Sequence, residues 1–344
     1  MGRITIRDIA RLSGVSVTTV SRALNDDPEI RAETRERVLR VCRETGYRAN
    51  LLARSLSSSR SHVLGVILPD ISNPFYAVLS LHIESCAKAR GYQIMLCRGH
   101  PDDRNDNTEE LISYLTGQQV DGILLPNSSS RATALLARYD RAIPSVLIGS
   151  APPEDLGIRV NSVSNDNYMG AQMAAEYLHR LGHRDVVYLG ARPGSYTHAL
   201  RHAGFLAVAK RLRMRVESIP SPLHASTIAQ GRTMAAALLR RPMTQTAIFC
   251  AADMLALGVM EAADELGLDI PGDFSLMGYD NIDYSALPKI RLTTVAQPFA
   301  DLAREGVEML VAQIKRGESG TYVRRLITPT LVERATCAPP PARD

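Results

Sequence analysis

The hydrophobic and polar positions of the first 45 residues predict three short helices. Thr5 stands three residues before Asp8, which is the spacing of a reciprocal N-terminal cap. Gly14 can end this first helix because glycine tolerates a positive φ, and Ser16 can cap a second helix with apolar residues at i, i+3 and i+4. The expected helices cover residues 6–13, 17–25 and 32–45.

Beyond residue 60 the pattern changes to short apolar runs that alternate with amphipathic segments. The run 63–68 is continuously apolar, as expected for a strand that is buried on both faces. Further strands are expected at about 92–97, 121–125, 144–148, 186–190, 246–250 and 274–278, and helices near 75–90, 107–117, 166–181, 199–212, 227–240, 253–266 and 299–316. This alternation predicts α/β architecture with parallel, doubly wound sheets, and the number of strands favours two similar lobes. A cleft between the lobes is the expected ligand pocket.

The net charge of +4 is unevenly distributed along the chain. Residues 1–60 hold twelve arginines, no lysine and seven acidic residues, which gives +5, whereas the other 284 residues hold 28 basic and 29 acidic residues, which gives −1. A basic segment joined to a near-neutral body is typical of a nucleic-acid-binding head on a second domain, although a solvated basic face would give the same count.

A helix, a glycine-containing turn and a second capped helix together form a helix-turn-helix motif. The second helix of such a motif enters the major groove of DNA, and its N-terminal side chains meet the base edges. Here Val17 can pack on a thymine methyl group, Thr18 can hydrogen-bond to either type of base, and Arg22 can pair with guanine. Ser16, Ser21 and Asn25 are small polar residues suited to phosphates, and Thr5 is a further DNA-binding candidate. Each residue alone would also fit an ordinary, capped three-helix bundle.

Composition disfavours several other classes of protein and site. The longest apolar runs are far shorter than the ~20 residues of a membrane helix, and no apolar signal segment follows Met1, so we expect a cytoplasmic protein without a membrane partner. The five cysteines form no C-x-x-C pair, which favours buried thiols over a disulfide framework or a zinc site. We expect neither a metal nor a cofactor.

Several motifs of the chain also occur together in one known family. They are Ile6-Arg7-Asp8-Ile9-Ala10, Gly14-Val15-Ser16, Thr19-Val20-Ser21-Arg22, Gly46-Tyr47 and, near the C-terminus, Thr328-Pro-Thr-Leu-Val-Glu-Arg. The set resembles the lactose-repressor (LacI/GalR) family of transcriptional regulators over almost the whole chain. The resemblance implies a repressor that binds double-stranded operator DNA.

The resemblance also implies a role for the stretch after the third helix. In this family the segment equivalent to about 50–58 is a hinge helix that folds on operator DNA, and a leucine at the position of Leu56 wedges into the minor groove. Asn50 and Ala53 are further DNA-binding candidates in the same stretch. Relatives carry a proline where this chain has Ala49, so folding of the hinge is expected to cost more here. Taken alone, Leu56 would also fit a loosely packed linker.

For the body, the resemblance implies two Rossmann-like lobes similar to those of periplasmic sugar-binding proteins. The chain is expected to cross between the lobes near residues 162, 293 and 325. The expected domains are an all-α head over 1–60, an effector-binding and dimerisation domain over 61–336 and a tail over 337–344, with the N-lobe over about 62–162 and 294–324 and the C-lobe over about 163–292 and 325–336.

Four residues match the effector contacts of the family. Arg201 and Asp280 match its ligand arginine and aspartate, and Phe75 and Phe299 match aromatic residues that line the pocket. A guanidinium, a carboxylate and aromatic faces suit a sugar-like ligand, because each hydroxyl can both donate and accept. Two further candidates are Ser150 and Tyr196. Read without the family, these residues would also fit the core or the solvated surface of an α/β fold.

Ala252 departs from the family pattern. Many relatives have Asn or Ser just before the aspartate that begins the 253–266 helix, so one polar contact with the ligand is expected to be missing here. For this reason the effector of a known relative cannot be transferred to this chain.

Two alternative functions belong to other classes. An enzyme is disfavoured because the chain has no G-x-G-x-x-G after its first strand, no phosphate loop, no H-E-x-x-H pair and no G-x-S-x-G elbow. A secreted sugar-binding protein fits the body but predicts a signal peptide in place of a helix-turn-helix. The combined interpretation is a homodimer, or a dimer of dimers, on a pseudo-palindromic operator, with an effector that acts as an inducer or as a corepressor.

Overall fold

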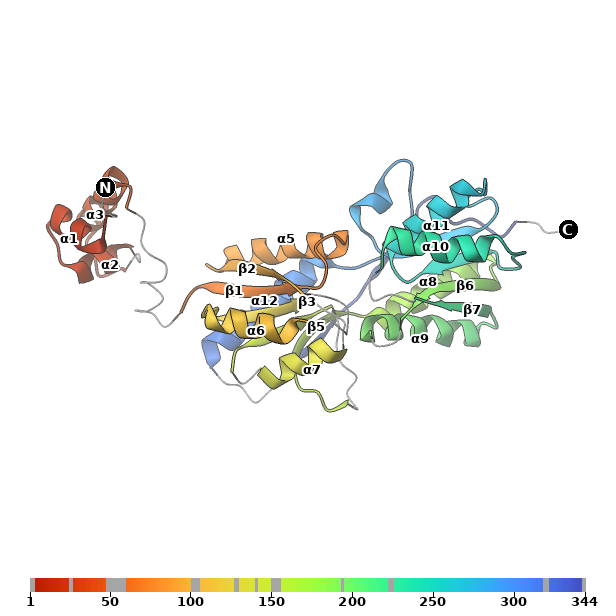
Figure 1. Ribbon diagram of the computed structural model, residues 1–344, viewed down its shortest axis with the longest axis horizontal. Helices are drawn as coiled ribbons and strands as arrows, with labels where there is room; N and C mark the ends of the chain where they lie inside the picture. Colours follow the sequence, from red (N-terminus) through yellow and green to blue (C-terminus); the bar gives the residue numbers. More distant parts are fainter. Residues whose placement is uncertain are drawn as a thin grey trace. The chain divides into compact units, whose positions relative to one another are not determined.

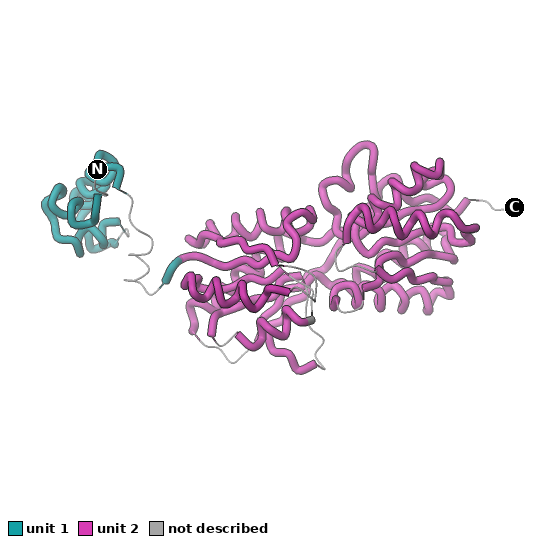
Figure 2. Tube along the Cα trace, viewed as in Figure 1, with its two compact units in different colours: residues 1–61 teal, residues 62–344 magenta. Residues whose placement is uncertain are grey.

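The protein is described here by a computed structural model, which forms two compact units, residues 1–61 and 62–344 (Figure 2). The residues that it describes are 4–24, 27–47, 60–99, 106–126, 130–139, 142–149, 156–192, 195–221, 226–317 and 322–341. Five predicted site residues lie outside these ranges: Asn25, Asn50, Ala53, Leu56 and Ser150.

The first unit is a three-helix head. Its helices are α1 (Ile6–Ser13), α2 (Val17–Leu24) and α3 (Ala32–Thr45). Ile9, Val20 and Val38 supply one fully buried side chain from each helix, so the three helices share a single small core. The bounds agree with those predicted from the apolar spacing.

The first sheet of the body has the strand order β11-β5-β4-β3-β1-β2. Figure 1 labels β1, β2, β3 and β5 of this sheet. Its strands are β1 (Val63–Leu68), β2 (Gln93–Arg98), β3 (Gly122–Pro126), β4 (Ser145–Ile148), β5 (Asn161–Asn165) and β11 (Arg324–Ile327). All of their pairings are parallel. One face packs on α5 (Pro74–Lys88) and α12 (Phe299–Arg316), and the other on α6 (Thr108–Gly117) and α7 (Ser130–Tyr139). Helices on both faces explain why β1 is continuously apolar.

The second sheet repeats this plan with the order β12-β10-β9-β8-β6-β7. Its strands are β6 (Asp185–Ala191), β7 (Arg215–Pro220), β8 (Ala247–Cys250), β9 (Ser275–Asp280), β10 (Thr293–Ala296) and β12 (Thr330–Val332), and only the pairing of β12 with β10 is antiparallel. One face packs on α8 (Asn167–Leu181) and α9 (Tyr196–Arg211), and the other on α10 (Ile228–Leu239) and α11 (Asp253–Glu265). The predicted two-lobed α/β class is confirmed.

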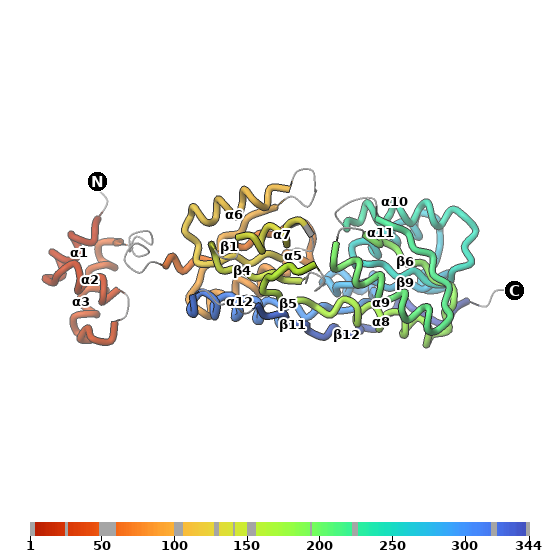
Figure 3. The backbone as a smooth tube through the Cα atoms, turned by 90° about the horizontal axis from the view of Figure 1, so that it is seen from below, coloured from red at the N-terminus to blue at the C-terminus, as the bar shows by residue number. Residues whose placement is uncertain are grey.

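The chain passes between the two sheets after β5, after β10 and after β11. These positions lie a few residues beyond the predicted 162, 293 and 325, because each of the three strands is completed in its own sheet before the chain leaves it. Residues 163–165 and 325–327 therefore belong to the first sheet, and 294–296 to the second. Figure 3 shows β11 and β12 on either side of the last crossing.

Six elements were missing from the sequence prediction: α7, β5, β7, β10, β11 and β12. The strands β7 and β11 lie at or next to sheet edges and carry alternating or largely exposed residues, so they present no continuous apolar run. β5, of sequence NSVSN, is fully buried yet mostly polar. Hydrophobicity alone does not identify such strands.

Candidate functional site

The predicted polar caps of the head are part of its helix ends. Thr5 accepts from the backbone N–H of Asp8 at 3.4 Å and donates its own N–H to the Asp8 carboxylate at 3.0 Å. Ser16 accepts from the N–H of Thr19 at 3.0 Å, which caps α2. Thr5 and Ser16 thus have structural roles whether or not they also meet a ligand.

The outer face of α2 carries the residues predicted to contact bases. Val17 is 41% exposed and Thr18 is exposed, while Ser21 is half-buried. Arg22 lies one turn beyond Thr18 on the same face, since residues four apart are neighbours on a helix. Its guanidinium forms ion pairs with Asp27 and Glu29 of the following loop.

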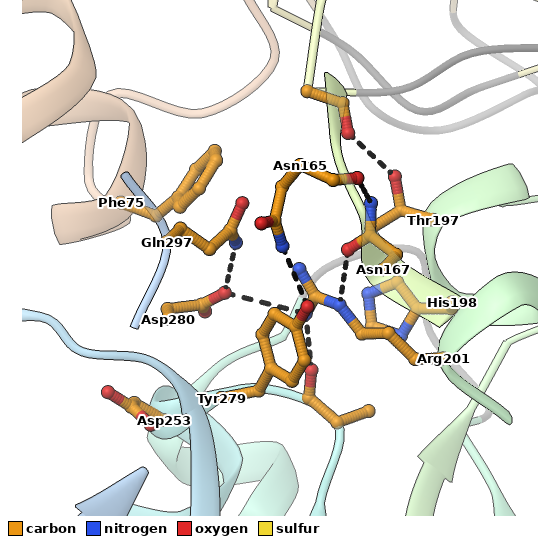
Figure 4. Close-up of polar contacts among 12 residues, drawn as sticks. Phe75, Asn165, Asn167, Thr197, His198, Arg201, Asp253, Tyr279, Asp280 and Gln297 are labelled. Atoms are coloured by element: carbon orange, nitrogen blue, oxygen red, sulfur yellow. Dashed lines mark hydrogen bonds and ion pairs between the residues drawn. The ribbon is translucent and has the colours of Figure 1, made fainter. Parts of the chain in front are cut away.

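A second group of polar residues gathers where the two lobes of the body meet, and we call it the interlobe cluster (Figure 4). Its members are Asn165, Asn167, Arg201, Tyr279, Asp280 and Gln297. Its residues come from both lobes: Asn165 ends β5 of the first sheet, and Asp280 ends β9 of the second. The carboxyl ends of parallel strands are the usual place for a ligand in such folds.

Arg201 is the cation of the interlobe cluster and is only 3% exposed. It donates through Nε to Asn167 Oδ1 at 2.9 Å and through Nη1 to the carbonyl of Ala251 at 2.6 Å. The same Nη1 lies 3.4 Å from a carboxylate oxygen of Asp280, and the guanidinium lies 3.6 Å above the centre of the Tyr279 ring. Nε and Nη1 are therefore engaged by the protein, and the position of the side chain is fixed.

Asp280 is buried next to Arg201 and accepts from Gln297 Nε2 at 2.6 Å. Burial raises the pKa of its carboxyl to about 7, against the opposing effect of the Arg201 charge. Its backbone has φ = 126°, and that of the following Asn281 has φ = 58°, which are unusual for non-glycine residues. A strained turn of this kind is held by its surroundings and is often found at a ligand site.

Among the described residues, hydrogen bonds join the lobes at the cluster and beside it. Asn165 donates from Nδ2 to the Tyr279 hydroxyl at 2.7 Å, and Thr197 donates to the carbonyl of Gly149 at 3.2 Å. Asn165 is 1% exposed, and its Oδ1 has no hydrogen-bond partner among the described residues. A buried, unpaired acceptor is costly, so it marks a place where a ligand hydroxyl or amine would be stabilised.

The predicted aromatic residues lie together in the first lobe. The rings of Phe75 and Phe299 have centroids 5.3 Å apart, and Phe75 contacts Tyr76 edge to face at 4.9 Å. Burial raises the pKa of the Tyr76 hydroxyl to about 12. Tyr196, another predicted contact, is the half-buried first residue of α9. Figure 4 shows Phe75 on the first-lobe side of Gln297 and Asp280.

Comparison with known proteins assigns the chain to a family. The model of the bacterial regulatory proteins of the lacI family matches residues 5–50, and that of the periplasmic binding protein-like domain matches residues 175–337. The ribose operon repressor of Halalkalibacterium halodurans is 31% identical over 333 residues, which cover 96% of this chain and 97% of that protein. The chain belongs to the LacI family.

Solved structures of transcriptional regulators match nearly the whole chain. The lac repressor dimer bound to operator and an anti-inducer matches with a TM-score of 0.84 and 26% identity, covering 98% of this chain and all of that one. The complex of the transcriptional regulator CelR with cellobiose matches with a TM-score of 0.69 and 27% identity, covering 97% and 100%.

LacI-family membership decides between the functional alternatives. The chain is a DNA-binding transcriptional regulator, as the helix-turn-helix and the motifs predicted, and it is not an enzyme. The secreted sugar-binding alternative is wrong, because residues 5–50 match the family's DNA-binding region. Among the described residues, none of the helices is both long and apolar enough to span a membrane.

Sequence reasoning missed four residues of the interlobe cluster: Asn165, Asn167, Tyr279 and Gln297. Asn165 is the last residue of a strand that was not predicted, and Asn167 follows it by two residues, so their place at a strand end could not be recognised. Tyr279 and Gln297 lie within two residues of the predicted Asp280 and Phe299. A polar residue at the carboxyl end of β9 or just beyond β10 is the sequence signal that could have identified them as site residues.

Ala252, where the chain departs from the LacI-family pattern, lies at the start of α11. Ala252 precedes α11 and offers no side-chain cap, and it packs in the apolar core beneath the second sheet. The neighbouring Asp253 is fully buried and accepts from Ile282 N, Ser285 Oγ and Thr294 Oγ1 at 2.6 to 3.1 Å. Its carboxylate is thus occupied in holding the turn after Asp280.

Proposed function

We propose that this regulator is a cytoplasmic repressor that binds a pseudo-palindromic operator as a dimer and responds to a sugar-like metabolite between its lobes. The observation that carries the proposal is the buried pair of Arg201 and Asp280, beside aromatic residues and at the carboxyl ends of the strands. Burying two charges costs free energy of desolvation, and an apolar core of the same volume is often at least as stable. A buried ion pair at this place is therefore better explained by ligand binding than by stability.

The hydrogen-bonding capacity of the cluster favours a neutral ligand with several hydroxyl groups. Arg201 already has two protein acceptors, whereas the buried Oδ1 of Asn165 needs a donor and Asp280 can accept further hydrogen bonds. Phe75 and Phe299 offer apolar faces for the C–H side of a ring. The cellobiose complex of the transcriptional regulator CelR, which is similar in structure to this chain, supports a sugar as the class of effector.

On the DNA side, we propose that α2 is the recognition helix. Val17 and Thr18 are exposed on its N-terminal turn, where a helix-turn-helix meets base edges. A single head buries too little surface for tight specific binding, so two-fold symmetry is expected. The structural match to the lac repressor dimer bound to operator supports a dimer here, and two such dimers would make a tetramer.

Effector and operator are expected to influence each other through lobe closure. A ligand held by the interlobe cluster contacts both lobes, so it favours one relative position of the lobes over another. By linkage, the factor by which the effector changes operator affinity equals the factor by which the operator changes effector affinity. We propose an inducer, which weakens operator binding; the opposite sign defines a corepressor.

Selection of bound duplexes from a random pool by the full-length protein tests the proposal. A two-fold-symmetric consensus is the expected result, and its half-site spacing should be that of a dimer. Binding that only follows salt concentration, with and without pooled sugars and nucleosides, would refute specific recognition. Each sugar is then added to the selected duplex: release identifies an inducer, tighter binding identifies a corepressor, and no response to any sugar or nucleoside contradicts the effector class.

A further inference from the structure

The guanidinium of Arg22 is held by two carboxylates from the loop that follows α2. It donates through Nε to Asp27 Oδ2 at 2.8 Å, and a terminal nitrogen contacts Glu29. These hydrogen bonds raise the pKa of Arg22 and lower that of Asp27, so both groups remain charged at neutral pH. A predicted base-contacting arginine is thus paired with acidic residues on its own chain.

The two carboxylates differ in how firmly they are held. Asp27 accepts from the Glu29 N–H at 3.0 Å, its own N–H donates to the Arg22 carbonyl at 3.1 Å, and its carbonyl accepts from Arg35 at 2.7 Å. Its side chain is 28% exposed. The Glu29 side chain is 77% exposed, and Arg22 is the one charged group that it contacts among the described residues. Asp27 is therefore fixed to α2 and α3, whereas Glu29 can turn away at little cost.

The geometry at Arg22 divides the donors of its guanidinium. Recognition of guanine by arginine uses two donors toward O6 and N7. With Nε bound to Asp27, the two terminal nitrogens form the remaining fork, and Glu29 occupies one of them. A base can engage this fork only after Glu29 has left, while the bond to Asp27 can remain.

We propose that Asp27 is a positioning residue that orients Arg22 for contact with a base, and that Glu29 is a competing carboxylate that DNA must displace. Glu29 then disfavours DNA that offers no good partner to Arg22. On such DNA the Glu29 carboxylate repels nearby phosphates, and the Arg22–Glu29 ion pair is lost without a base contact to replace it. The pair of acids increases sequence discrimination at one base pair. This inference rests on the proposal that α2 is the recognition helix.

The test measures binding of the full-length protein to the selected duplex and to all of its single-base-pair variants. The proteins are the wild type, Arg22→Ala, Asp27→Asn, Glu29→Gln and the double variant Arg22→Ala/Asp27→Asn. Glu44→Gln is the matched control, because Glu44 is an exposed acid near the other end of α3 and its loss changes the net charge equally. Thermal melting of each protein verifies that the head is folded.

Arg22→Ala is expected to lose about 10-fold discrimination at one base pair of each half-site. Asp27→Asn should lose discrimination at that same base pair, and the double variant should lose no more than Arg22→Ala alone. Glu29→Gln should bind random duplexes several-fold more tightly than Glu44→Gln does, with a smaller preference at that base pair. If Asp27→Asn proves unstable, Arg22→Lys takes its place in the test. This substitution keeps the positive charge without the two-donor fork, so it should also lose discrimination at that one base pair.

Equal weakening by Asp27→Asn on every duplex would overturn the positioning role, as would additive losses in the double variant. Equal behaviour of Glu29→Gln and Glu44→Gln would overturn the role of Glu29. These outcomes leave the proposed function intact. Failure of the wild type to select any duplex contradicts the proposed function itself, and with it this inference.

Discussion

Replacing Arg201 should destabilise the body of the protein, and more at high pH than at low pH. Arg201 is 3% exposed and lies 3.4 Å from Asp280, so Arg201→Met leaves a buried carboxylate without its cation. Removal of one partner from a buried ion pair costs about 3–5 kcal/mol. The methionine fills part of the vacated space, so this loss reflects the missing charge and the unpaired acceptors of Asn167 and Ala251 more than packing.

The pH dependence follows from the carboxyl of Asp280. Its pKa is about 7 in the folded protein and 3.8 in the unfolded reference, so the neutral form is the one that folding favours. Its contribution to stability is fully present below pH 3.8 and is lost as the pH rises through 7, by about 4 kcal/mol in total. At pH 5 the folded carboxyl is mostly protonated and needs no cation, whereas at pH 8 it is mostly charged.

We therefore expect Arg201→Met to cost up to about 1.4 kcal/mol more stability at pH 8 than at pH 5, because above pH 7 the wild type keeps its charged carboxyl beside Arg201, whereas in the variant the pKa of Asp280 rises further. Denaturation at fixed protein concentration measures this for the wild type, Arg201→Met, Asp280→Asn and the double variant. The double variant should recover much of the loss at pH 8, since no buried charge remains. Arg180→Met is the control, because Arg180 is 66% exposed in a surface ion pair and should cost about 0–1 kcal/mol at both pH values.

Two results would refute this reasoning. One is an equal cost of Arg201→Met at pH 8 and pH 5, which would show that the charge of Asp280 does not respond to Arg201. The other is strict additivity of the two single substitutions at pH 8, which would show that the residues do not interact energetically.

Three further predictions concern the effector site, the core and the hinge. Phe299→Ala should weaken effector binding about 10-fold with operator affinity unchanged, measured by titration of effector into the protein and its selected duplex; equal effector affinities would remove Phe299 from the site. Gly258→Ala should cost about 2 kcal/mol or more in thermal unfolding, because its new Cβ would lie 2.1 Å from the Ile228 carbonyl oxygen, whereas Gly267→Ala, with φ = 69° and nothing within 4 Å, should cost only about 1 kcal/mol. Leu56→Ala should weaken binding to the selected duplex more than to random DNA, and equal losses on both would contradict the minor-groove wedge.

The head could be predicted from its sequence because local signals determine most of it. The cap at Thr5, the glycine at position 14 and the apolar spacing in α2 all act within a few residues, and the structure has each helix within a residue of its predicted bounds. The ion pairs of Arg22 could not be predicted in this way. They depend on the path of the loop through Asp27 and Glu29, which the spacing of apolar residues does not determine.

The body shows the complementary limit. Arg201 and Asp280 were predicted to share a site, and the structure brings them into contact although 78 residues separate them in the chain. The partners of this pair were not predicted, because Asn165 belongs to a buried but polar strand that has no hydrophobic signature. A polar residue in such a strand is satisfied only by tertiary neighbours, here the Tyr279 hydroxyl, and sequence patterns carry no information about those neighbours.

The position of the interlobe cluster relates ligand binding directly to lobe movement. Asn165 is the last residue of β5, just before the first crossing between the lobes, and Gln297 is the first residue after β10, where the second crossing begins. Asn165 is hydrogen-bonded to Tyr279, and Gln297 to Asp280, which begins a turn with two positive φ values. A ligand that takes over the hydrogen bonds of Asp280 or Asn165 would therefore change contacts of the crossing segments themselves. We infer that no long chain of intermediate residues is needed between the effector and lobe closure, because the residues proposed to hold the effector are also those that connect the lobes.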